Sequence, residues 1–268
     1  MSETIVSVII SAYNCAPYIA EALDSIINQT YESWELIICD DGSDDGTWDI
    51  IQKYNEKYSG KIIPLRNKVN RKQAFSRNRC IKRARGSYIA LMDADDLCDS
   101  SRLKKQVDYL DIHQEISFVG TGMIIFDETG EWGQSIGKPL VEPIDLIAGS
   151  GFIAASCMFR KEALLSIKGY RTNSKYFFVE DYELIQRLYE AGYKGANIQE
   201  PLYKYREYQQ TIERRRLINR IHGAMLIIRG IHVFKLSPKL FPHVFRGIIV
   251  GLLPSGLYKY LHRRKYYL

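Results

Sequence analysis

The sequence contains 268 residues, of which 46% are hydrophobic and 25% are charged. These values are typical of one sizeable globular unit, or of a main domain with an appendage, and they argue against disordered and fibrous classes. The five cysteines are scattered without CxxC pairs, which predicts reduced thiols and argues against a disulfide framework or a zinc site. A secretory signal is not expected, because no apolar segment follows a charged one at the start of the sequence.

Charge is distributed unevenly along the chain. The region 201–268 carries 14 Lys and Arg residues against two Glu residues, a balance of +12, whereas the region 1–200 carries a balance of −6. The sequence therefore predicts an acidic body followed by a basic, amphipathic tail, residues 211–268.

Strand and helix patterns alternate over the first hundred residues. Apolar runs predict buried strands, and apolar residues at helical spacing predict helices between them. The expected strands are 5–10, 34–39, 61–65 and 88–92, and the expected helices lie at 17–27, 48–54 and 73–85. Such alternation is typical of an α/β fold with a mainly parallel sheet, in which ligands bind outside the carboxyl ends of the strands.

The pattern is less regular after residue 100. A helix is expected near 103–110, followed by short strands at 116–120 and 123–126, a turn at 127–130, and a helix near 179–191. We find no internal repeat and no low-complexity segment, so this region is expected to complete the same domain.

Three carboxylates lie where the fourth predicted strand becomes a loop, at Asp93, Asp95 and Asp96. Side chains alternate along an extended segment, so Asp93 and Asp95 can point to one side while the loop turns Asp96. Clustered carboxylates repel one another unless a cation neutralises them, and hard oxygen ligands select Mg²⁺ or Mn²⁺, which also bind phosphate. The motif therefore predicts a divalent-metal site, with a solvated turn that caps a helix as the alternative.

A second acidic loop, residues 40–43, follows the second predicted strand. Taken alone, its composition is typical of a turn. Its neighbours change the interpretation, because Ser11 and Tyr13 end the first strand region and Arg77 lies on a later helix. A carboxylate such as Asp41 can accept from a base or a ribose, a tyrosine can stack on a base, and arginine can pair with phosphate. Together these residues predict a nucleotide site.

Four segments resemble glycosyltransferase family 2 in order and spacing: SVIISAYN at 7–14, DDGSDDGT at 40–47, RN at 77–78 and GSYIALMDADD at 86–96. The resemblance covers residues 5 to about 100 and extends through 180–181 to 205–206. It implies a GT-A fold, inversion at the anomeric carbon and a nucleotide-sugar donor, with UDP favoured. Residues 1–100 would form the donor-binding half of the domain, and 101–210 the acceptor-binding half.

The resemblance also implies roles for individual residues. By position, Ser11, Tyr13 and Asp41 would hold the nucleoside. Asp95 would contact the ribose side, and Asp96 would bind the metal on the diphosphate. Ser11 departs from the pattern, because the family often has proline or threonine there.

Asp181 would be the general base by the same resemblance, and Arg77 would approach the nucleotide. A general base is chemically required, because the acceptor hydroxyl must lose its proton. No acid is needed on the other side, because a metal would stabilise the departing diphosphate. The residues alone leave an alternative open, since acidic side chains in a first helical turn favour the helix dipole. Glu180 and Ser156 are acceptor candidates, the latter because this family builds acceptor contacts in the region 149–160.

The basic tail mixes cationic, aromatic and aliphatic residues. Its uncharged runs are shorter than the ~18–20 residues that a spanning helix needs, and Pro242 and Pro254 interrupt them. This composition predicts peripheral contact with an anionic membrane surface, with a tail that packs on the body as the alternative. Nucleic acid is not expected as a partner, because no recognition motif accompanies the charge.

These features predict an inverting, metal-dependent glycosyltransferase. It would act on a saccharide or lipid-linked saccharide in cell-surface polysaccharide synthesis, at the cytoplasmic face of the membrane. A nucleotidyltransferase is the nearest rival, but it would normally carry a glycine-rich phosphate loop with a basic residue, and residues 11–18 contain neither glycine nor lysine. A dinucleotide oxidoreductase would show GxGxxG after the first strand. A binding module without catalysis is disfavoured, because the acidic loops and Asp181 occur together.

Overall fold

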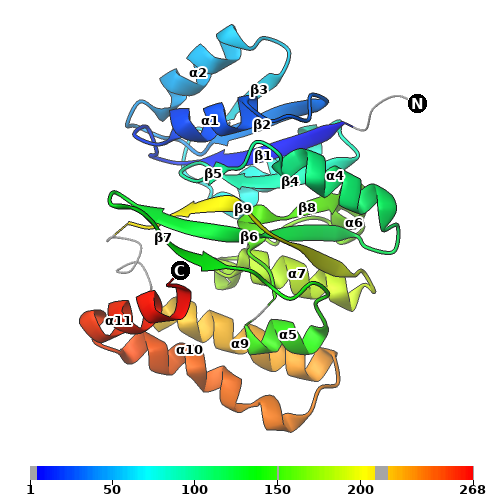
Figure 1. Cartoon of the computed structure of the whole chain (residues 1–268), viewed down its shortest axis with the longest axis vertical. Helices are drawn as coiled ribbons and strands as arrows, with labels where there is room; N and C mark the ends of the chain where they lie inside the picture. The colour runs from blue at the N-terminus through cyan, green and yellow to red at the C-terminus, as the bar shows by residue number, and fades with distance from the viewer. Residues whose placement is uncertain (1–4, 150, 209–216, 268) are drawn as a thin grey trace.

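The computed structural model describes residues 5–149, 151–208 and 217–267. Within them, nine strands form one sheet in the order β3-β2-β1-β4-β8-β6-β9-β5, and β7 pairs with β6. The sheet crosses the middle of the molecule, with helices on both of its faces (Figure 1). The predicted α/β architecture is therefore confirmed.

Parallel strands make up the N-terminal half of the sheet: β1 (Val6–Ala12), β2 (Trp34–Asp40), β3 (Ile62–Arg66) and β4 (Tyr88–Asp93). All of β2 and all of β1 except Ser11 are buried, as expected for parallel strands covered on both faces. Ser11 pairs in register with Cys39 on one side and with Asp93 on the other. The two acidic loops therefore begin at the same edge of the sheet.

The other half of the sheet is mixed and comprises β5 (Leu97–Cys98), β6 (Phe118–Asp127), β7 (Gly130–Ser135), β8 (Met158–Arg160) and β9 (Gly195–Arg206). β6 runs parallel to β9, whereas β5, β7 and β8 pair antiparallel with their neighbours. The expectation of two short strands at 116–120 and 123–126 is wrong. β6 is continuous, because its pairing with β9 absorbs an irregularity between Thr121 and Met123 without a break.

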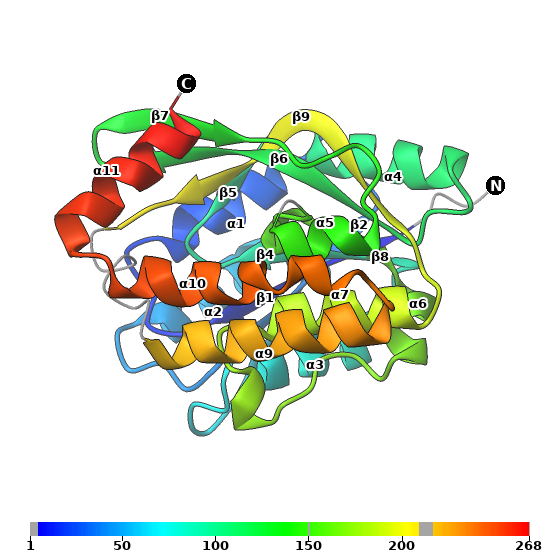
Figure 2. The ribbon, with the colours of Figure 1, turned by 90° about the horizontal axis from the view of Figure 1, so that it is seen from below.

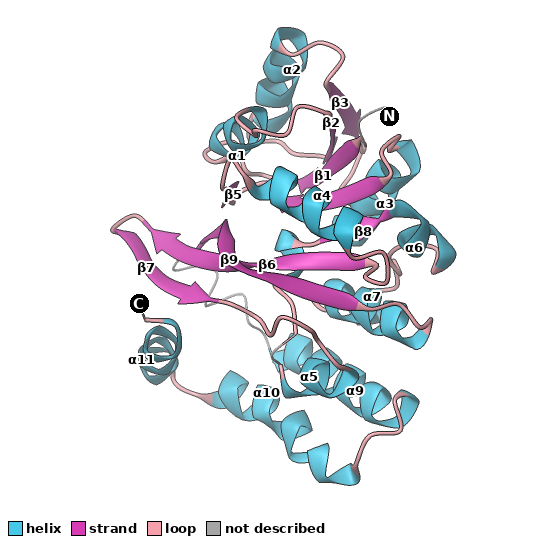
Figure 3. Ribbon diagram, turned by 45° about the vertical axis from the view of Figure 1, so that its right-hand side comes forward, coloured by secondary structure: helices cyan, strands magenta, loops and turns pink. Residues whose placement is uncertain are grey.

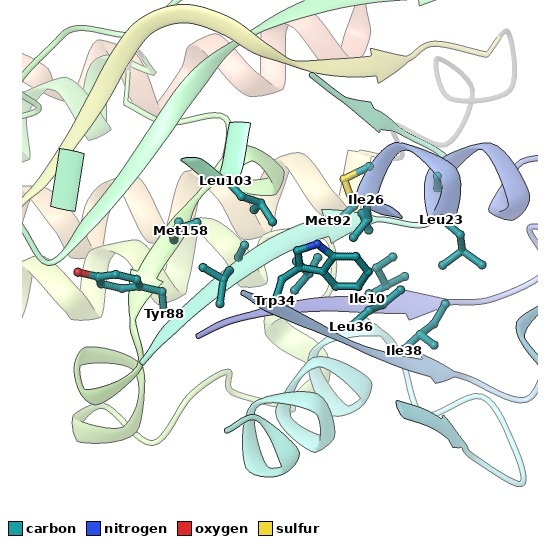
Figure 4. Packing of buried hydrophobic residues seen from close by; sticks show 14 of the residues in the cluster. Ile10, Leu23, Ile26, Trp34, Leu36, Ile38, Tyr88, Met92, Leu103 and Met158 are labelled. Carbon is teal, nitrogen blue, oxygen red and sulfur yellow. The ribbon is translucent and has the colours of Figure 1, made fainter. Parts of the chain in front are cut away.

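Helices cover the two faces of the sheet in two sets. One face is covered by α1 (Ile19–Ile27), α2 (Thr47–Lys57) and α4 (Arg102–Ile112), and the other by α3 (Gln73–Arg83), α6 (Lys161–Ser166) and α7 (Glu180–Glu190). Along β1, Val8 and Ile10 join the first core whereas Ile9 joins the second, because successive strand side chains point to opposite faces. Figure 4 shows Leu23 and other residues of the first core packed over the strands.

The C-terminal part adds a layer of helices beyond the sheet. It contains α9 (Leu217–Val233), α10 (Pro242–Leu252) and α11 (Ser255–Tyr266), and it packs on α5 (Pro143–Ala148) and α7. Three single-turn helices are also present, at Ala154–Ser156, Ser174–Tyr176 and Pro238–Leu240. Figure 3 shows α9 beside α5 and below α7, and Figure 2 shows α9 and α10 lying side by side, with α11 near β7. Across the described ranges, none of the helices has the length and apolar content needed to cross a bilayer.

Candidate active site

The loops that follow β1 and β2 are tied to each other by hydrogen bonds. The Asn14 backbone N–H donates to Ser43 Oγ at 3.0 Å, and its side-chain amide donates to Asp44 Oδ1 at 2.9 Å. Asn14 adopts a φ of 48°, a left-handed conformation that asparagine tolerates better than most residues. The first strand loop is therefore held in a fixed position against the second.

Asp41 begins the second loop and is almost fully buried, with 2% exposure. Its Oδ1 accepts hydrogen bonds from the Asn67 amide at 2.5 Å, the Arg71 backbone N–H at 2.9 Å and the Ser76 hydroxyl at 3.0 Å. A cleft of 360 Å³ opens beside this loop and is lined by Gly42, Ser43, Arg66, Asn67 and Lys68. The predicted nucleoside carboxylate thus lies next to a cleft, fixed through one of its two oxygens.

Ser11 and Tyr13 lie at the end of β1. Ser11 is half-buried in the sheet edge next to Asp93, and the Tyr13 side chain is 50% exposed. An exposed tyrosine ring at a sheet edge has a free face on which an aromatic ligand can stack. The structure therefore brings both residues to the edge where the acidic loops begin.

Asp93 and Asp96 lie on either side of the turn that joins β4 to β5. Asp93 Oδ1 accepts from Arg77 Nη2 at 2.7 Å. Asp96 is 1% exposed; its Oδ2 accepts from the Tyr203 hydroxyl and its Oδ1 from the Arg206 backbone N–H, both at 2.8 Å. Both carboxylates are therefore held by contacts within the protein.

The charge of this carboxylate cluster is incompletely neutralised. Burial, followed by the charge of Asp93, raises the pKa of Asp95 to about 6, although the nearby Tyr208 hydroxyl lowers it. Burial and the charges of Asp93 and Asp95 also raise the pKa of Asp96 well above its ordinary value. Across the part of the chain that the structure describes, no three His, Cys, Asp or Glu side chains gather as ligands of one ion. The three-aspartate metal site expected from the sequence stays a prediction.

Arg77 joins this cluster to the start of α7. Its side chain is 1% exposed, and Nη2 pairs with Asp93 at 2.7 Å while Nη1 pairs with Asp181 at 2.6 Å. The guanidinium also lies 5.5 Å from the centre of the Tyr170 ring. The structure thus places the cation between two acidic residues that are 88 positions apart in the sequence.

Asp181 lies in the first turn of α7, with 29% of its side chain exposed. Its Oδ1 accepts from Arg77 at 2.6 Å and from the Tyr170 hydroxyl at 2.9 Å. A pocket of 290 Å³ opens at this residue, and its lining is mostly apolar: Leu146, Gly149, Gly151, Phe152, Ala154, Phe178, Val179, Asp181, Tyr182 and Ile185. A carboxylate oxygen at the wall of such a pocket can accept a proton from a bound hydroxyl.

The two acceptor candidates lie in different surroundings. Glu180 precedes Asp181, and burial, followed by the charge of Asp181, raises the pKa of Glu180 to about 7. Ser156 is fully buried; its hydroxyl donates to the Ile153 carbonyl at 2.7 Å and accepts from the Thr121 N–H at 2.9 Å. Ser156 therefore contributes to the interior packing and presents no surface to an acceptor.

Several residues of the site come from segments outside the acidic turn and the first turn of α7. Tyr203 and Arg206 lie on β9, 107 and 110 residues along the chain from the Asp96 that they hold. Tyr170 contacts Asp181 from a segment without a motif. The pair at 205–206 was included in the family resemblance, whereas Tyr170 and Tyr203 are recognisable only once the chain is folded.

The fold resembles those of solved glycosyltransferases. Over 97% of this chain and 87% of the other, it matches S. aureus TarS in complex with UDP-GlcNAc with a TM-score of 0.67 at 19% identity. Over 97% of this chain and 79% of the other, it matches the mannosyltransferase PcManGT from Pyrobaculum calidifontis, solved with GDP-Man and Mn²⁺, with a TM-score of 0.65 at 18% identity. The architecture is therefore that of the GT-A glycosyltransferases.

Sequence comparison identifies the family. The model of "Glycosyl transferase family 2" matches residues 7–167. The Bacillus subtilis (strain 168) protein called "Putative glycosyltransferase EpsE" is 38% identical over 97% of this chain and 94% of its own length. The chain belongs to glycosyl transferase family 2 and is a transferase enzyme, so the resemblance predicted from its motifs is confirmed.

A second relative matches a shorter region. The Escherichia coli protein WfaP, a UDP-Glc:alpha-D-GlcNAc-diphosphoundecaprenol beta-1,3-glucosyltransferase, is 40% identical over 40% of this chain and 41% of its own length. Another relative is named for polysaccharide synthesis: the E. coli protein called "O-antigen biosynthesis glycosyltransferase WbnJ" is 28% identical over 78% of this chain and 82% of its own length.

Proposed function

We propose that this enzyme transfers one sugar, with inversion, from a nucleotide sugar to a hydroxyl of a lipid-linked saccharide, in the synthesis of a cell-surface polysaccharide. The observation that carries the proposal is the bridge formed by Arg77. It fixes Asp181, at the wall of a pocket, relative to Asp93, at the start of the acidic turn. This bridge would hold the proposed proton acceptor at a defined separation from the proposed diphosphate site.

The donor would bind at the edge formed by the ends of β1, β2 and β4. Asp41 keeps Oδ2 for a ligand, because its three hydrogen bonds from Asn67, Arg71 and Ser76 all end on Oδ1. A uracil N–H or a ribose hydroxyl could donate to that oxygen, and the exposed Tyr13 ring could stack on the base. UDP as the nucleotide is supported by the name of WfaP and by the nucleotide bound to TarS.

A divalent cation, Mn²⁺ or Mg²⁺, fits the acidic turn. Ions of this class commonly use one or two protein carboxylates together with substrate phosphates, so a complete protein cage is not required. Burial, followed by the charges of neighbouring aspartates, raises the pKa values of Asp95 and Asp96, and a bound cation would offset the cost of keeping these carboxylates ionised. We assign Asp95 and Asp96 as the ligands, as the family resemblance implies for Asp96, and Asp93 as the residue that holds Arg77 beside the turn. When bound, the ion would stabilise the charge that develops on the diphosphate.

Asp181 is assigned as the general base. Its hydrogen bonds from Arg77 and Tyr170 both end on Oδ1, which leaves Oδ2 to accept a proton. The acceptor O–H bond would break towards Oδ2 while the acceptor oxygen bonds to the anomeric carbon and the bond to the diphosphate breaks.

A lipid-linked acceptor is supported by the chemistry that WfaP's name describes, a sugar on diphosphoundecaprenol. The apolar lining of the pocket beside Asp181 is compatible with the carbon face of a sugar or with an N-acetyl methyl group. An enzyme that uses such a substrate would act at the cytoplasmic surface of the membrane.

Replacement of Asp181 by Asn tests the assignment. We expect transfer to fall by about 10²–10⁴-fold, which is the usual contribution of a general base. Binding of UDP with Mn²⁺, followed as thermal stabilisation, should remain close to that of the wild type, because Asp181 is not on the donor side. Asp49→Asn, which alters an exposed aspartate in the first turn of α2, is the matched control and should leave both properties unchanged. Unchanged turnover in the Asp181 variant would remove this residue from the base role.

A further inference from the structure

Helix α10 has apolar residues on two sides, and only one of them packs on the protein. Val244 and Ile248 face the cluster formed with α5 and α9. Phe245, Ile249 and Leu252 face outward, with 57%, 59% and 69% of their side chains exposed. Spacings of four and three residues put these side chains on one stripe of the helix surface, so the exposure is a continuous feature.

Helix α11 also carries exposed apolar residues. Tyr258 and His262 face inward, where the Tyr258 hydroxyl lies 3.2 Å from His262 Nδ1 and His262 Nε2 lies 2.8 Å from Glu207. On the outside, Leu257 is 48% exposed and Leu261, one turn later, is 45% exposed. We call the outward residues of the two helices, Phe241, Phe245, Ile249, Leu252, Leu257, Tyr260 and Leu261, the C-terminal apolar face.

The charged residues of the helices that carry this face are all basic. The range 217–267 contains no Asp or Glu. Two of its arginines are neutralised by the body, Arg229 by Glu190 and Arg263 by Asp127. Lys239 and Lys259 are exposed and, among the described residues, form no ion pair. Unpaired cations beside exposed apolar groups are the combination that binds the headgroups and outer acyl region of an anionic bilayer.

We propose that the C-terminal apolar face lies on an anionic phospholipid membrane. Phe245, Ile249 and Leu257 would enter the headgroup region, and the surrounding lysines and arginines would contact lipid phosphates. A second copy of the chain is the less suitable occupant, because a two-fold interface would bring these like charges together.

The position of this face also suits a membrane-bound acceptor. Leu146 of helix α5 lines the pocket beside Asp181. The next residue, Ile147, belongs to the hydrophobic cluster that α5 forms with α9 and α10. The membrane-facing layer and the acceptor pocket therefore share one short helix. This relation rests on the proposed function, whereas binding of the protein to lipid does not.

Vesicle flotation of the full chain, without donor or acceptor, tests the proposal. The wild type should bind vesicles of phosphatidylcholine mixed with phosphatidylglycerol and bind phosphatidylcholine alone weakly, and salt should reduce the binding. Phe245→Ser combined with Ile249→Ser should weaken binding to the anionic vesicles by about tenfold or more. Ile112→Ser is the control, because Ile112 is 76% exposed on α4, within the body of the protein.

A charge variant separates the electrostatic contribution to vesicle binding from the apolar contribution. Lys239→Glu with Lys259→Glu should weaken binding to anionic vesicles and leave the weak binding to phosphatidylcholine unchanged. Unchanged melting temperatures would exclude unfolding as the cause in either variant. The proposal would be overturned if the Phe245 and Ile249 variant bound vesicles as the wild type does. It would also be overturned if sedimentation equilibrium showed that these substitutions separate a dimer into monomers while flotation is unchanged. Because transfer activity is not measured here, failure of this proposal and failure of the proposed function are distinguishable.

Discussion

Arg77 is the residue on which the geometry of the site depends. A guanidinium that is 99% shielded from solvent must be compensated, and here two carboxylates, Asp93 and Asp181, compensate it from opposite sides. Because its nitrogens lie in a plane, arginine can reach both partners at once, which a lysine ammonium on a single stem cannot. We therefore regard Arg77 as a positioning residue for the base. Its sequence-based role, an approach to the nucleotide, remains a prediction.

The variant Arg77→Lys should separate charge from geometry. We expect kcat to fall by about 10–100-fold with a smaller change in the KM for the donor, because Asp181 is displaced while the nucleoside contacts remain. The free energy of unfolding should fall by about 2–4 kcal/mol, less than for a fully buried pair since both carboxylates are partly exposed. Steady-state kinetics and urea unfolding measure the two effects.

Arg83→Lys is the matched control, because Arg83 lies on the same helix with its side chain exposed. It should leave kinetics and stability unchanged. A variant of Arg77 that loses stability but keeps the wild-type kcat would contradict the positioning role and leave only a structural one.

Among the elements, β1, β2 and the turn before β4 meet at one buried carboxylate, Glu35. Its oxygens accept from the Ser7 hydroxyl at 2.6 Å, from the Arg85 backbone N–H at 2.6 Å and from Arg85 Nε at 2.8 Å. A side chain at Gly86 would come within 2.5 Å of the Ile5 carbonyl oxygen, so only glycine allows the turn to approach β1 this closely. Through these hydrogen bonds, Glu35 holds the turn before β4 against β1 and β2, and β4 is the strand that ends at Asp93.

Glu35 also makes the stability dependent on pH. Burial opposes its ionisation, but the hydrogen bonds from Ser7 and Arg85 outweigh burial and hold the pKa of Glu35 below its ordinary value. A carboxyl whose pKa is lower in the folded state stabilises the protein above the pKa of the unfolded chain. That contribution disappears as the pH falls through the folded-state pKa.

We expect Glu35→Gln to lower the free energy of unfolding by about 1–3 kcal/mol at neutral pH. The difference from the wild type should shrink as the pH is lowered through the acidic range, because the wild-type carboxyl then becomes protonated as well. Urea unfolding at a series of pH values measures this. Glu56→Gln, at an exposed position of α2, should show no such trend. A difference that stays constant with pH would contradict the assignment.

At the scale of the whole molecule, the described part of the basic tail, residues 217–267, forms part of the folded unit. Ile231 and Ala224 of α9 pack with Ile147 of α5, and Gln186 of α7 donates to the Leu226 carbonyl at 2.9 Å. The sequence left two alternatives for the tail, packing on the body or lying on a membrane. The structure shows the first, and α10 and α11 keep an exposed face that is compatible with the second.

Shortening Ile231 to Ala should therefore destabilise the entire protein. Removing three carbons from this position, which is 6% exposed, should cost about 2–4 kcal/mol and lower the midpoint of one shared unfolding transition. Circular dichroism and tryptophan fluorescence should report the same midpoint. Ile228→Ala, on the same helix but 44% exposed, should have a much smaller effect. Two separate transitions in the wild type would mean that the tail and the body unfold independently.

The sequence by itself determined the elements that have a strong local signal. Four parallel strands, their helices, and the position of both acidic loops at strand ends follow from hydrophobic periodicity, which each short segment carries independently of the rest. Family membership followed as well, because its motifs lie close together within residues 7–96. The short strand β8 and the helix α5 were not predicted, because segments of three and six residues are too short to show a period.

Only the tertiary structure decided which charges meet. Arg77 contacts Asp181 across 104 residues, and Asp96 is held by Tyr203 across 107, so no local pattern encodes either contact. The burial of Ser156 could not be predicted for the same reason. Its sequence position made it an acceptor candidate, but its hydroxyl donates to the Ile153 carbonyl inside the fold. Burial and hydrogen bonding depend on what packs around a side chain, and that is set by segments brought together from distant parts of the chain.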